Sequence, residues 1–131
     1  MEAAAIDTSL LIDLQRSPRN AQRKRAYSWL EAHSSTVLKI PAVVLGEFSA
    51  GFTNSDDEQL VSLRQRHEIL EIGPLEAGCY GRIYREMKRL GTLIGGNDLW
   101  IAATALVADL PLVTRNVEHF GRVEGLTIEP Y

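Results

Sequence analysis

Short apolar runs alternate along this chain with longer segments in which apolar residues recur every three or four positions. The apolar runs predict five strands, at residues 3–6, 37–40, 69–72, 111–114 and 126–128. The periodic segments predict helices at about 10–16, 19–33, 42–52, 54–67, 75–90 and 99–106. This alternation is typical of an α/β domain with a mostly parallel sheet.

Several helix ends carry signals of their own. The Ser17-Pro18 pair ends the first helix, in which Asp13 is one of the polar positions. The acidic run at 54–58 predicts a helix start, because acidic side chains favour the positive end of the helix dipole. Gly91 is suited to cap the helix that ends near residue 90, since glycine readily adopts the left-handed conformation.

Composition narrows the class of protein. The 131 residues fit one domain, and 45% hydrophobic with 24% charged residues is ordinary globular usage. Fourteen Lys and Arg against 17 Asp and Glu give a net charge of −3, which leaves no basic excess for non-specific nucleic-acid binding. Cys79 is the single cysteine, so an intramolecular disulfide and a Cys-rich zinc site are excluded.

Targeting signals are not apparent in the sequence. The N-terminus lacks the basic start and long apolar stretch of a signal peptide, and no apolar run approaches the roughly 20 residues of a membrane span. We therefore expect a cytoplasmic protein without a membrane partner.

Three carboxylates stand in apolar surroundings: Asp7 after the first strand, Glu47 within an apolar helix, and Asp98 before Leu99. Each has a simple structural interpretation, since Asp7 and Asp98 could cap helices and Glu47 could face solvent. The topology adds a second one, because ligands of parallel α/β sheets bind at the carboxyl edge of the strands. All three acids are expected at that edge, together with the segment 114–116.

Carboxylates gathered at one edge repel one another unless a cation binds between them. Ligands that are all oxygen favour Mg²⁺ or Mn²⁺, and the absence of His and Cys from the set disfavours zinc. Such an ion suits phosphoryl chemistry, in which a metal-activated water attacks and no side chain is the nucleophile. The sequence contains no nucleophile elbow, P-loop or dinucleotide glycine motif.

Four motifs together resemble a known family. They are Ile6-Asp7-Thr8-Ser9, Gly46-Glu47 followed by Gly51, Asn97-Asp98-Leu99-Trp100-Ile101-Ala102-Ala103, and Leu112-Val113-Thr114-Arg115-Asn116 followed by Phe120. In order and spacing they resemble the PIN domain, most of all the VapC-type ribonuclease toxins of toxin–antitoxin pairs. The resemblance covers essentially the whole chain, and implies a three-layer α/β/α sandwich with a central, mainly parallel, five-stranded sheet. It also implies Mg²⁺- or Mn²⁺-dependent endonucleolytic cleavage of RNA.

The resemblance also assigns residues. Asp7, Glu47 and Asp98 match the acidic metal-binding triad, and Thr8 and Thr114 match the family's supporting hydroxyl residues. Two positions depart from the pattern, and they are Asn116, where many members carry a fourth acid, and His119, where a nearby Asp is common. Asn116 is therefore a weaker metal ligand, which puts a second metal site in doubt.

The resemblance implies three partners: an RNA substrate, a cognate antitoxin that inserts a segment at the site, and a second copy in a homodimer. The helices near Trp29 and Phe52 are candidates for the dimer face. Arg115, beside the expected site, is the basic residue best placed to bind RNA. Trp100 is expected in the core more than in base stacking.

Two clusters of basic residues have two interpretations each, either a solvated helix face or a contact to RNA phosphates. The first cluster comprises Arg16, Arg19, Arg23, Lys24 and Arg25, and the second comprises Arg82, Arg85, Lys88 and Arg89. Within the second, Arg82 is spaced to pair with Glu86.

Two other functions are open from the sequence. A phosphatase of the aspartyl-phosphate kind would use Asp7 as its nucleophile, but Ser9 stands where that class carries a second Asp. A PIN-like module with a weakened site would only bind RNA or a protein, and Asn116 is the residue that favours it.

Overall fold

The fold is described by a computed structural model that covers residues 1–131. Its sheet has five strands: β1 (Ala3–Ile6), β2 (Val37–Pro41), β3 (Ile69–Leu70), β4 (Leu112–Thr114) and β5 (Ile128–Pro130). Their order across the sheet is β3-β2-β1-β4-β5, and every neighbouring pair is parallel. The five-stranded sheet predicted from the sequence is therefore confirmed, and it is parallel throughout.

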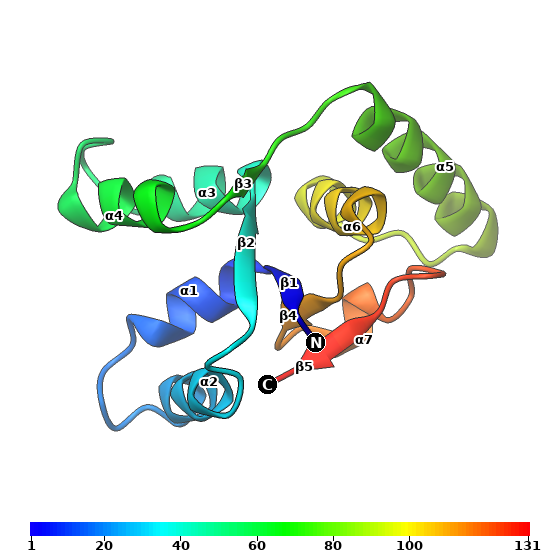
Figure 1. Cartoon of the computed structure of the whole chain (residues 1–131). Coiled ribbons are helices and arrows are strands. Elements are labelled where there is room, and N and C mark those ends of the chain that lie inside the picture. The colour runs from blue at the N-terminus through cyan, green and yellow to red at the C-terminus, as the bar shows by residue number, and fades with distance from the viewer.

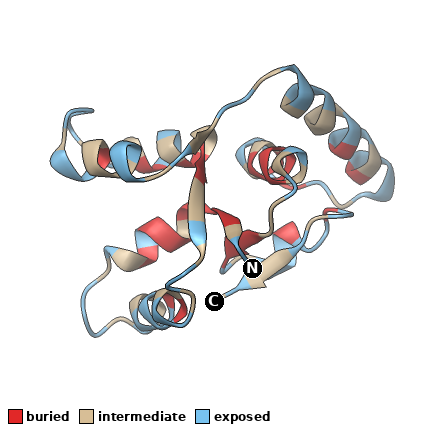
Figure 2. Ribbon diagram, viewed as in Figure 1, coloured by how far each residue is buried: buried red, intermediate tan, exposed pale blue.

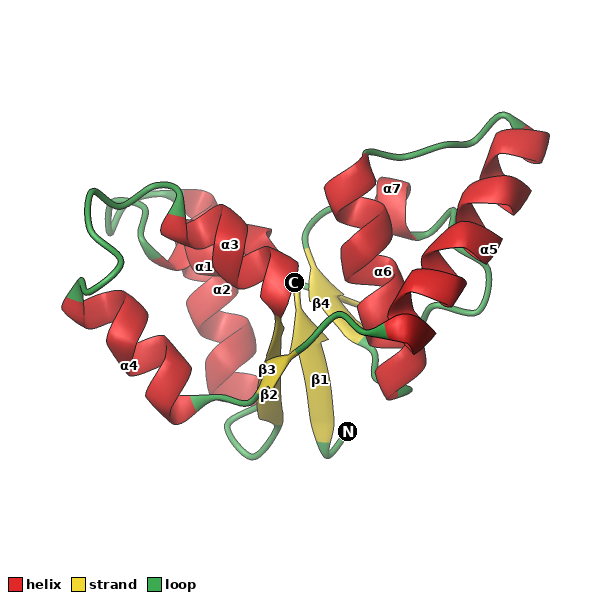
Figure 3. Cartoon of the chain, turned by 90° about the horizontal axis from the view of Figure 1, so that it is seen from above, coloured by secondary structure: helices red, strands yellow, loops and turns green.

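Seven helices flank the sheet: α1 (Thr8–Leu14), α2 (Ala21–Ala32), α3 (Ala42–Ser49), α4 (Glu58–Arg66), α5 (Pro74–Leu90), α6 (Gly96–Ala108) and α7 (Val117–Phe120). The first four cover one face of the sheet and the last three cover the other (Figures 1 and 3). This is the three-layer α/β/α arrangement that the resemblance implied.

The core lies where both helical layers meet the sheet (Figure 2). β1 is the central strand, and its Ala4 and Ala5 are fully buried. Alanine is a weak strand former, so this strand forms because of its central position, where small side chains let helices approach both faces. Six of the 13 residues of α6 are buried, with Leu99 and Ile101 among them. Its Trp100 stacks on Tyr80 of α5 at 4.2 Å between ring centroids.

The helix ends follow the expected signals in most places. α4 begins after Asp57, whose carboxylate accepts from the backbone N–H of Gln59, and α5 ends at Gly91 with φ 70°. Several boundaries differ from the prediction: α1 covers residues 8–14 instead of 10–16, α3 ends at 49 instead of 52, α4 begins at 58 instead of 54, and α6 begins at 96 instead of 99. Among the strands, β3 has two residues instead of four, and β5 begins at 128 instead of 126. α7 was not predicted, because four residues are too few to show a helical period.

Trp29 does not offer the exposed apolar surface expected of a dimer face. It is 6% exposed, stacks on His33, and donates its indole N–H to Glu129 of β5 at 3.3 Å. The Trp29 side of α2 packs this helix within its own domain, and the position of the dimer face stays a prediction. Phe52 is half-buried and packs edge-on against Phe48.

The basic clusters are partly engaged within the chain. Arg16 pairs with Asp13 at 2.7 Å, and Arg23 donates to the backbone carbonyl of Leu14 at 2.9 Å, near the end of α1. In the second cluster Glu86 pairs with Arg89 at 2.6 Å, not with Arg82 as predicted. The i,i+3 partner reaches Glu86, while Arg82 turns towards Cys79.

No helix is both long enough and apolar enough to cross a membrane.

Candidate active site

Asp7 lies between β1 and α1, at the carboxyl edge of the sheet, and is 6% exposed. It caps α1, since its Oδ1 accepts from the backbone N–H of Thr8 at 2.8 Å. Its Oδ2 accepts from the hydroxyls of Ser9 at 2.9 Å and Thr114 at 2.8 Å. The two interpretations of Asp7 are therefore compatible, because the same carboxylate caps a helix and faces the edge of the sheet.

The charge of Asp7 is poorly compensated. Burial raises the pKa of its carboxyl group, and the nearby charge of Glu47 raises it further. The hydrogen bonds from Thr114, Ser9 and Thr8 act in the opposite direction but do not outweigh burial. All three donors are neutral, so this buried carboxylate has no cationic partner of its own.

Glu47 reaches the same edge from the second turn of α3. The hydroxyl of Thr8 donates to Oε1 of Glu47 at 2.7 Å. Thr8, which was predicted as a supporting residue, therefore connects α1 to Glu47. Asn97 of α6 donates to Oε2 at 3.4 Å. Asn97 had been given no role of its own, because its contact depends on how α3 and α6 pack.

Asp98 lies in the first turn of α6 and is half-buried. It is not the N-cap, which is Gly95. Burial raises the pKa of Asp98, and the charges of Asp7 and Glu47 raise it further, while His119 lowers it from 4.0 Å away. The charges of the three carboxylates therefore repel one another, although the residues come from positions 7, 47 and 98 of the chain.

Thr114 and the residues after it lie beside Asp7 at the same edge of the sheet. The Thr114 hydroxyl that donates to Asp7 also accepts the backbone N–H of Asn116 at 2.9 Å. The side-chain amide of Asn116 lies 3.1 Å from the ring of His119. The two residues that depart from the family pattern therefore contact each other at the edge of the acidic group.

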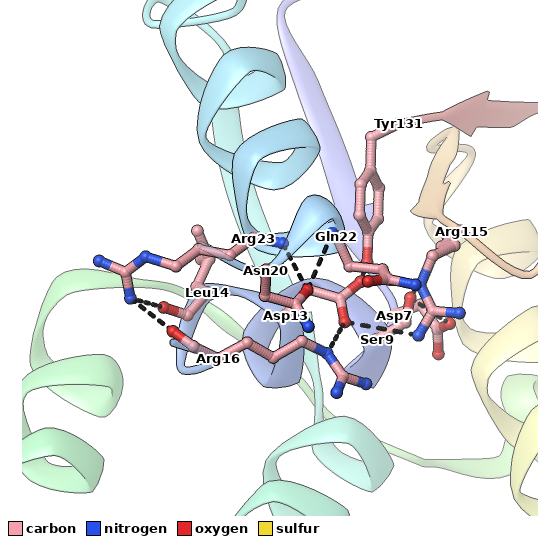
Figure 4. Close-up of polar contacts among 10 residues, drawn as sticks. All are labelled: Asp7, Ser9, Asp13, Leu14, Arg16, Asn20, Gln22, Arg23, Arg115 and Tyr131. Atoms are coloured by element: carbon pink, nitrogen blue, oxygen red, sulfur yellow. Dashed lines mark hydrogen bonds and ion pairs between the residues drawn. The ribbon is translucent and has the colours of Figure 1, made fainter. Parts of the chain in front are cut away.

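Arg115 is engaged by another carboxylate. Its guanidinium pairs with Asp13 at 2.8 Å (Figure 4), and its side chain is 37% exposed. Ser9, Asp13 and Tyr131 thus belong to the surroundings of the site although the sequence indicated no role for them. Asp13 reads as one polar position among others in a short helix, and only the tertiary structure shows that it is fully buried.

The donors at this edge fit a hard divalent cation in chemistry. Carboxylate and hydroxyl oxygens surround Asp7 and Glu47, and Mg²⁺ and Mn²⁺ prefer such ligands. As the side chains stand, no three His, Cys, Asp or Glu residues form a group close enough to hold a metal ion. The ligand types are in place, and Glu47 is turned towards Thr8 and Asn97.

Known proteins resemble this chain in sequence and in fold. The family model of the PIN domain matches residues 4–126. Ribonuclease VapC1 of Methanocaldococcus jannaschii is 32% identical over 127 residues, which covers 96% of this chain and 85% of that protein. Ribonuclease VapC2 of Rickettsia felis is 30% identical over 100 residues, 72% of this chain and 75% of that protein.

Among solved structures, VapBC-1 from nontypeable Haemophilus influenzae has a TM-score of 0.80 at 26% identity, with 98% of this chain and 97% of that chain covered. VapC20 of Mycobacterium tuberculosis, described as a toxin that cleaves the sarcin–ricin loop, has a TM-score of 0.68 at 16% identity and shares the fold.

Proposed function

This chain belongs to the PIN domain family and, within it, to the VapC ribonucleases; from this premise we propose that it is an endoribonuclease that acts as the toxin of a toxin–antitoxin pair. The observation that carries the proposal is the acidic group of Asp7, Glu47 and Asp98. It draws on three distant segments, lies at the ligand-binding edge of a parallel sheet, and includes no cationic residue that pairs with Asp7 or Glu47.

We propose Mg²⁺ or Mn²⁺ as the cofactor, held by Asp7, Asp98 and Glu47, with Asn116 as a weaker ligand. A bound divalent ion supplies a polarised phosphoryl oxygen and a water of lowered pKa. The raised pKa values of Asp7 and Asp98 support this proposal, because a site that needs its carboxylates ionised at neutral pH gains from a cation nearby.

The chain's own residues orient the acids. The hydroxyls of Thr114 and Ser9 and the N–H of Thr8 fix both oxygens of Asp7. Thr8 Oγ1 fixes one oxygen of Glu47. Each of these hydroxyls donates to a carboxylate, so each holds one carboxylate oxygen in a defined orientation at the edge of the sheet.

We propose an antitoxin protein and a second copy of the chain as partners. The likeness to VapBC complexes supports the antitoxin, since each of those structures pairs a toxin with its antitoxin. The acidic edge would attract a basic side chain of such a partner, because this edge carries uncompensated negative charge.

The test is cleavage of RNA by the purified, antitoxin-free protein. Ribosomal RNA and transfer RNA are incubated with Mg²⁺, with Mn²⁺ or with a chelator, beside the variant Asp7→Asn and the matched control Asp56→Asn, which changes an exposed aspartate in the segment before α4. We expect metal-dependent cleavage by the wild type and the control, and none by Asp7→Asn.

Two outcomes would favour the other functions. RNA binding without cleavage at any metal concentration would favour the binding module that Asn116 suggests. Hydrolysis of small phosphoesters would favour the phosphatase. The sequence argues against the latter, because Ser9 stands where that class carries a second Asp.

A further inference from the structure

Asp13 has the most completely compensated charge of the buried carboxylates. Its Oδ1 accepts from Arg16 Nε at 2.7 Å and from Arg115 Nη2 at 3.4 Å. Its Oδ2 accepts from Arg115 Nε at 2.8 Å and from the hydroxyl of Tyr131 at 2.8 Å. Four donors from three parts of the chain therefore meet on one side chain that is 0% exposed (Figure 4).

Arg115 connects this cluster to the acidic site. Its side chain binds Asp13, while its backbone N–H donates to Ser9 Oγ at 3.3 Å, and Ser9 Oγ donates to Asp7 Oδ2. On either side of Arg115, the Thr114 hydroxyl donates to the same oxygen of Asp7 and accepts from the N–H of Asn116. The segment 114–116 thus touches Asp7 through two hydroxyls.

We propose that Asp13 and Arg115 form a clamp that holds the segment 114–116 against α1 and so orients Asp7 for cleavage. Both are positioning residues. This inference rests on the proposed function, and it gives Arg115 a task other than the RNA contact expected from the sequence. The clamp joins α1, the end of β4 and the residue after β5, elements that are distant in sequence.

The geometry of the clamp requires an arginine. The planar guanidinium offers Nε and Nη2 to the two oxygens of Asp13 at once, which a lysine ammonium cannot do in the same way. Tyr131 is the third residue that donates to Asp13. Burial, and to a smaller extent the Asp13 carboxylate, raises the pKa of the Tyr131 hydroxyl, so the hydroxyl keeps its proton and remains a donor.

The clamp and an RNA contact predict opposite results for two variants. Asp13→Asn breaks the clamp but frees the Arg115 guanidinium, so a clamp predicts a loss of activity and an RNA contact predicts none or a gain. Arg115→Lys keeps the positive charge but loses the fork, so it damages a clamp and largely spares a phosphate contact. Arg16→Gln is the matched control, since Arg16 also binds Asp13 but does not touch the segment 114–116.

The experiment measures cleavage under multiple-turnover conditions and amide hydrogen exchange in the same proteins. For Asp13→Asn and Arg115→Lys we expect kcat to fall about tenfold or more, with KM within about twofold, because small displacements of reacting groups are costly. The backbone amides of Arg115 and Asn116 should exchange at least about tenfold faster, and Arg16→Gln should leave both readouts unchanged. If Asp13→Asn fails to fold, Arg115→Lys and Tyr131→Phe provide the same comparison.

RNA affinity is the second arm, measured for Arg115→Gln in an Asp98→Asn background that does not cleave. A clamp predicts unchanged affinity and an unchanged salt dependence. A fall of about 0.7 in the slope of log affinity against log salt would overturn the proposal, as that is one lost contact to single-stranded phosphate. The proposal would also be overturned if Asp13→Asn and Arg115→Lys both kept the amide exchange rates and the kcat of the wild type. Absence of cleavage by the wild type would instead overturn the proposed function, and the exchange rates would then judge the clamp.

Discussion

Two buried aspartates at opposite ends of α1 have opposite electrostatic surroundings. Asp7 is 6% exposed, accepts only from neutral donors and has Glu47 nearby, so the pKa of its carboxyl is raised. Asp13 is 0% exposed, and burial alone would raise its pKa, but Arg115, Arg16 and Tyr131 outweigh this and lower it. One short helix therefore carries one uncompensated and one fully compensated carboxylate.

The difference shows that burial alone does not identify a functional acid. A buried carboxylate with guanidinium partners stabilises the fold at neutral pH, since its charge is matched within the chain. A buried carboxylate beside two others costs stability and is retained where a ligand supplies the missing positive charge. Substitution, added metal and pH should each affect Asp13 differently from the acidic group of Asp7, Glu47 and Asp98.

The largest effect is expected for Asp98→Asn, in which activity and stability should separate. RNA cleavage should fall by about a thousandfold, which is about 4 kcal/mol of transition-state stabilisation. The free energy of unfolding should not fall, because the substitution removes a charge that Asp7 and Glu47 repel. Single-turnover cleavage and urea denaturation measure the two quantities. A variant that loses both together would remove the contrast.

Asp13→Asn should show the reverse order of effects. We expect the free energy of unfolding to fall by about 2–3 kcal/mol, because two guanidinium groups and a hydroxyl lose a matched acceptor. The value lies below that of a fully buried pair, since the Arg16 and Arg115 side chains are 39% and 37% exposed. Urea denaturation beside Asp56→Asn, a change at an exposed position, provides the comparison. Equal stability of the two variants would contradict the structural role of Asp13.

Divalent cations should stabilise the acidic group and not the Asp13 cluster. At ten times the dissociation constant, Mg²⁺ or Mn²⁺ should add about 1.4 kcal/mol to the free energy of unfolding. The added stability should disappear in Asp98→Asn and persist in Arg16→Gln. Thermal unfolding with metal and with a chelator measures it, and a melting temperature that ignores millimolar metal would count against a cation at this site.

The smallest effect concerns pH in the metal-free protein. A carboxyl whose folded pKa is raised binds more protons folded than unfolded, so its contribution to stability falls as pH rises from about 3.8 through the raised pKa. The stability gained by Asp98→Asn at neutral pH should therefore shrink as the pH is lowered through that range. A gain that stays constant down to pH 4 would show that repulsion is not its cause.

For Asp13 the sign is reversed. Its lowered folded pKa gives stability that is present above the ordinary value of 3.8 and is lost as pH falls through the lowered pKa. The deficit of Asp13→Asn should thus be constant between pH 5 and 8 and shrink only below about pH 4. Both series use the same denaturation measurement.

The order of the strands and of every helix except α7 could be predicted from the sequence, because it depends on local patterns. Apolar runs marked all five strands, and Gly91 marked the end of α5 through its backbone freedom. The convergence of Asp7, Glu47 and Asp98 was predicted by a rule of topology, since helices of parallel sheets begin at one edge. The positions of their carboxylate oxygens relative to one another could not be predicted, because they depend on side-chain rotations at that edge.

The fold class, the family and the three candidate acids could be inferred from the linear chain, because periodicity and motif order are properties of the sequence. The tertiary structure alone decided which of two similar aspartates is compensated. Asp13 and Arg115 lie 102 positions apart, and Asp13 and Tyr131 lie 118 apart. No local pattern records such pairings, since they arise only when β4 and β5 dock beside α1 and bring their side chains to one buried point.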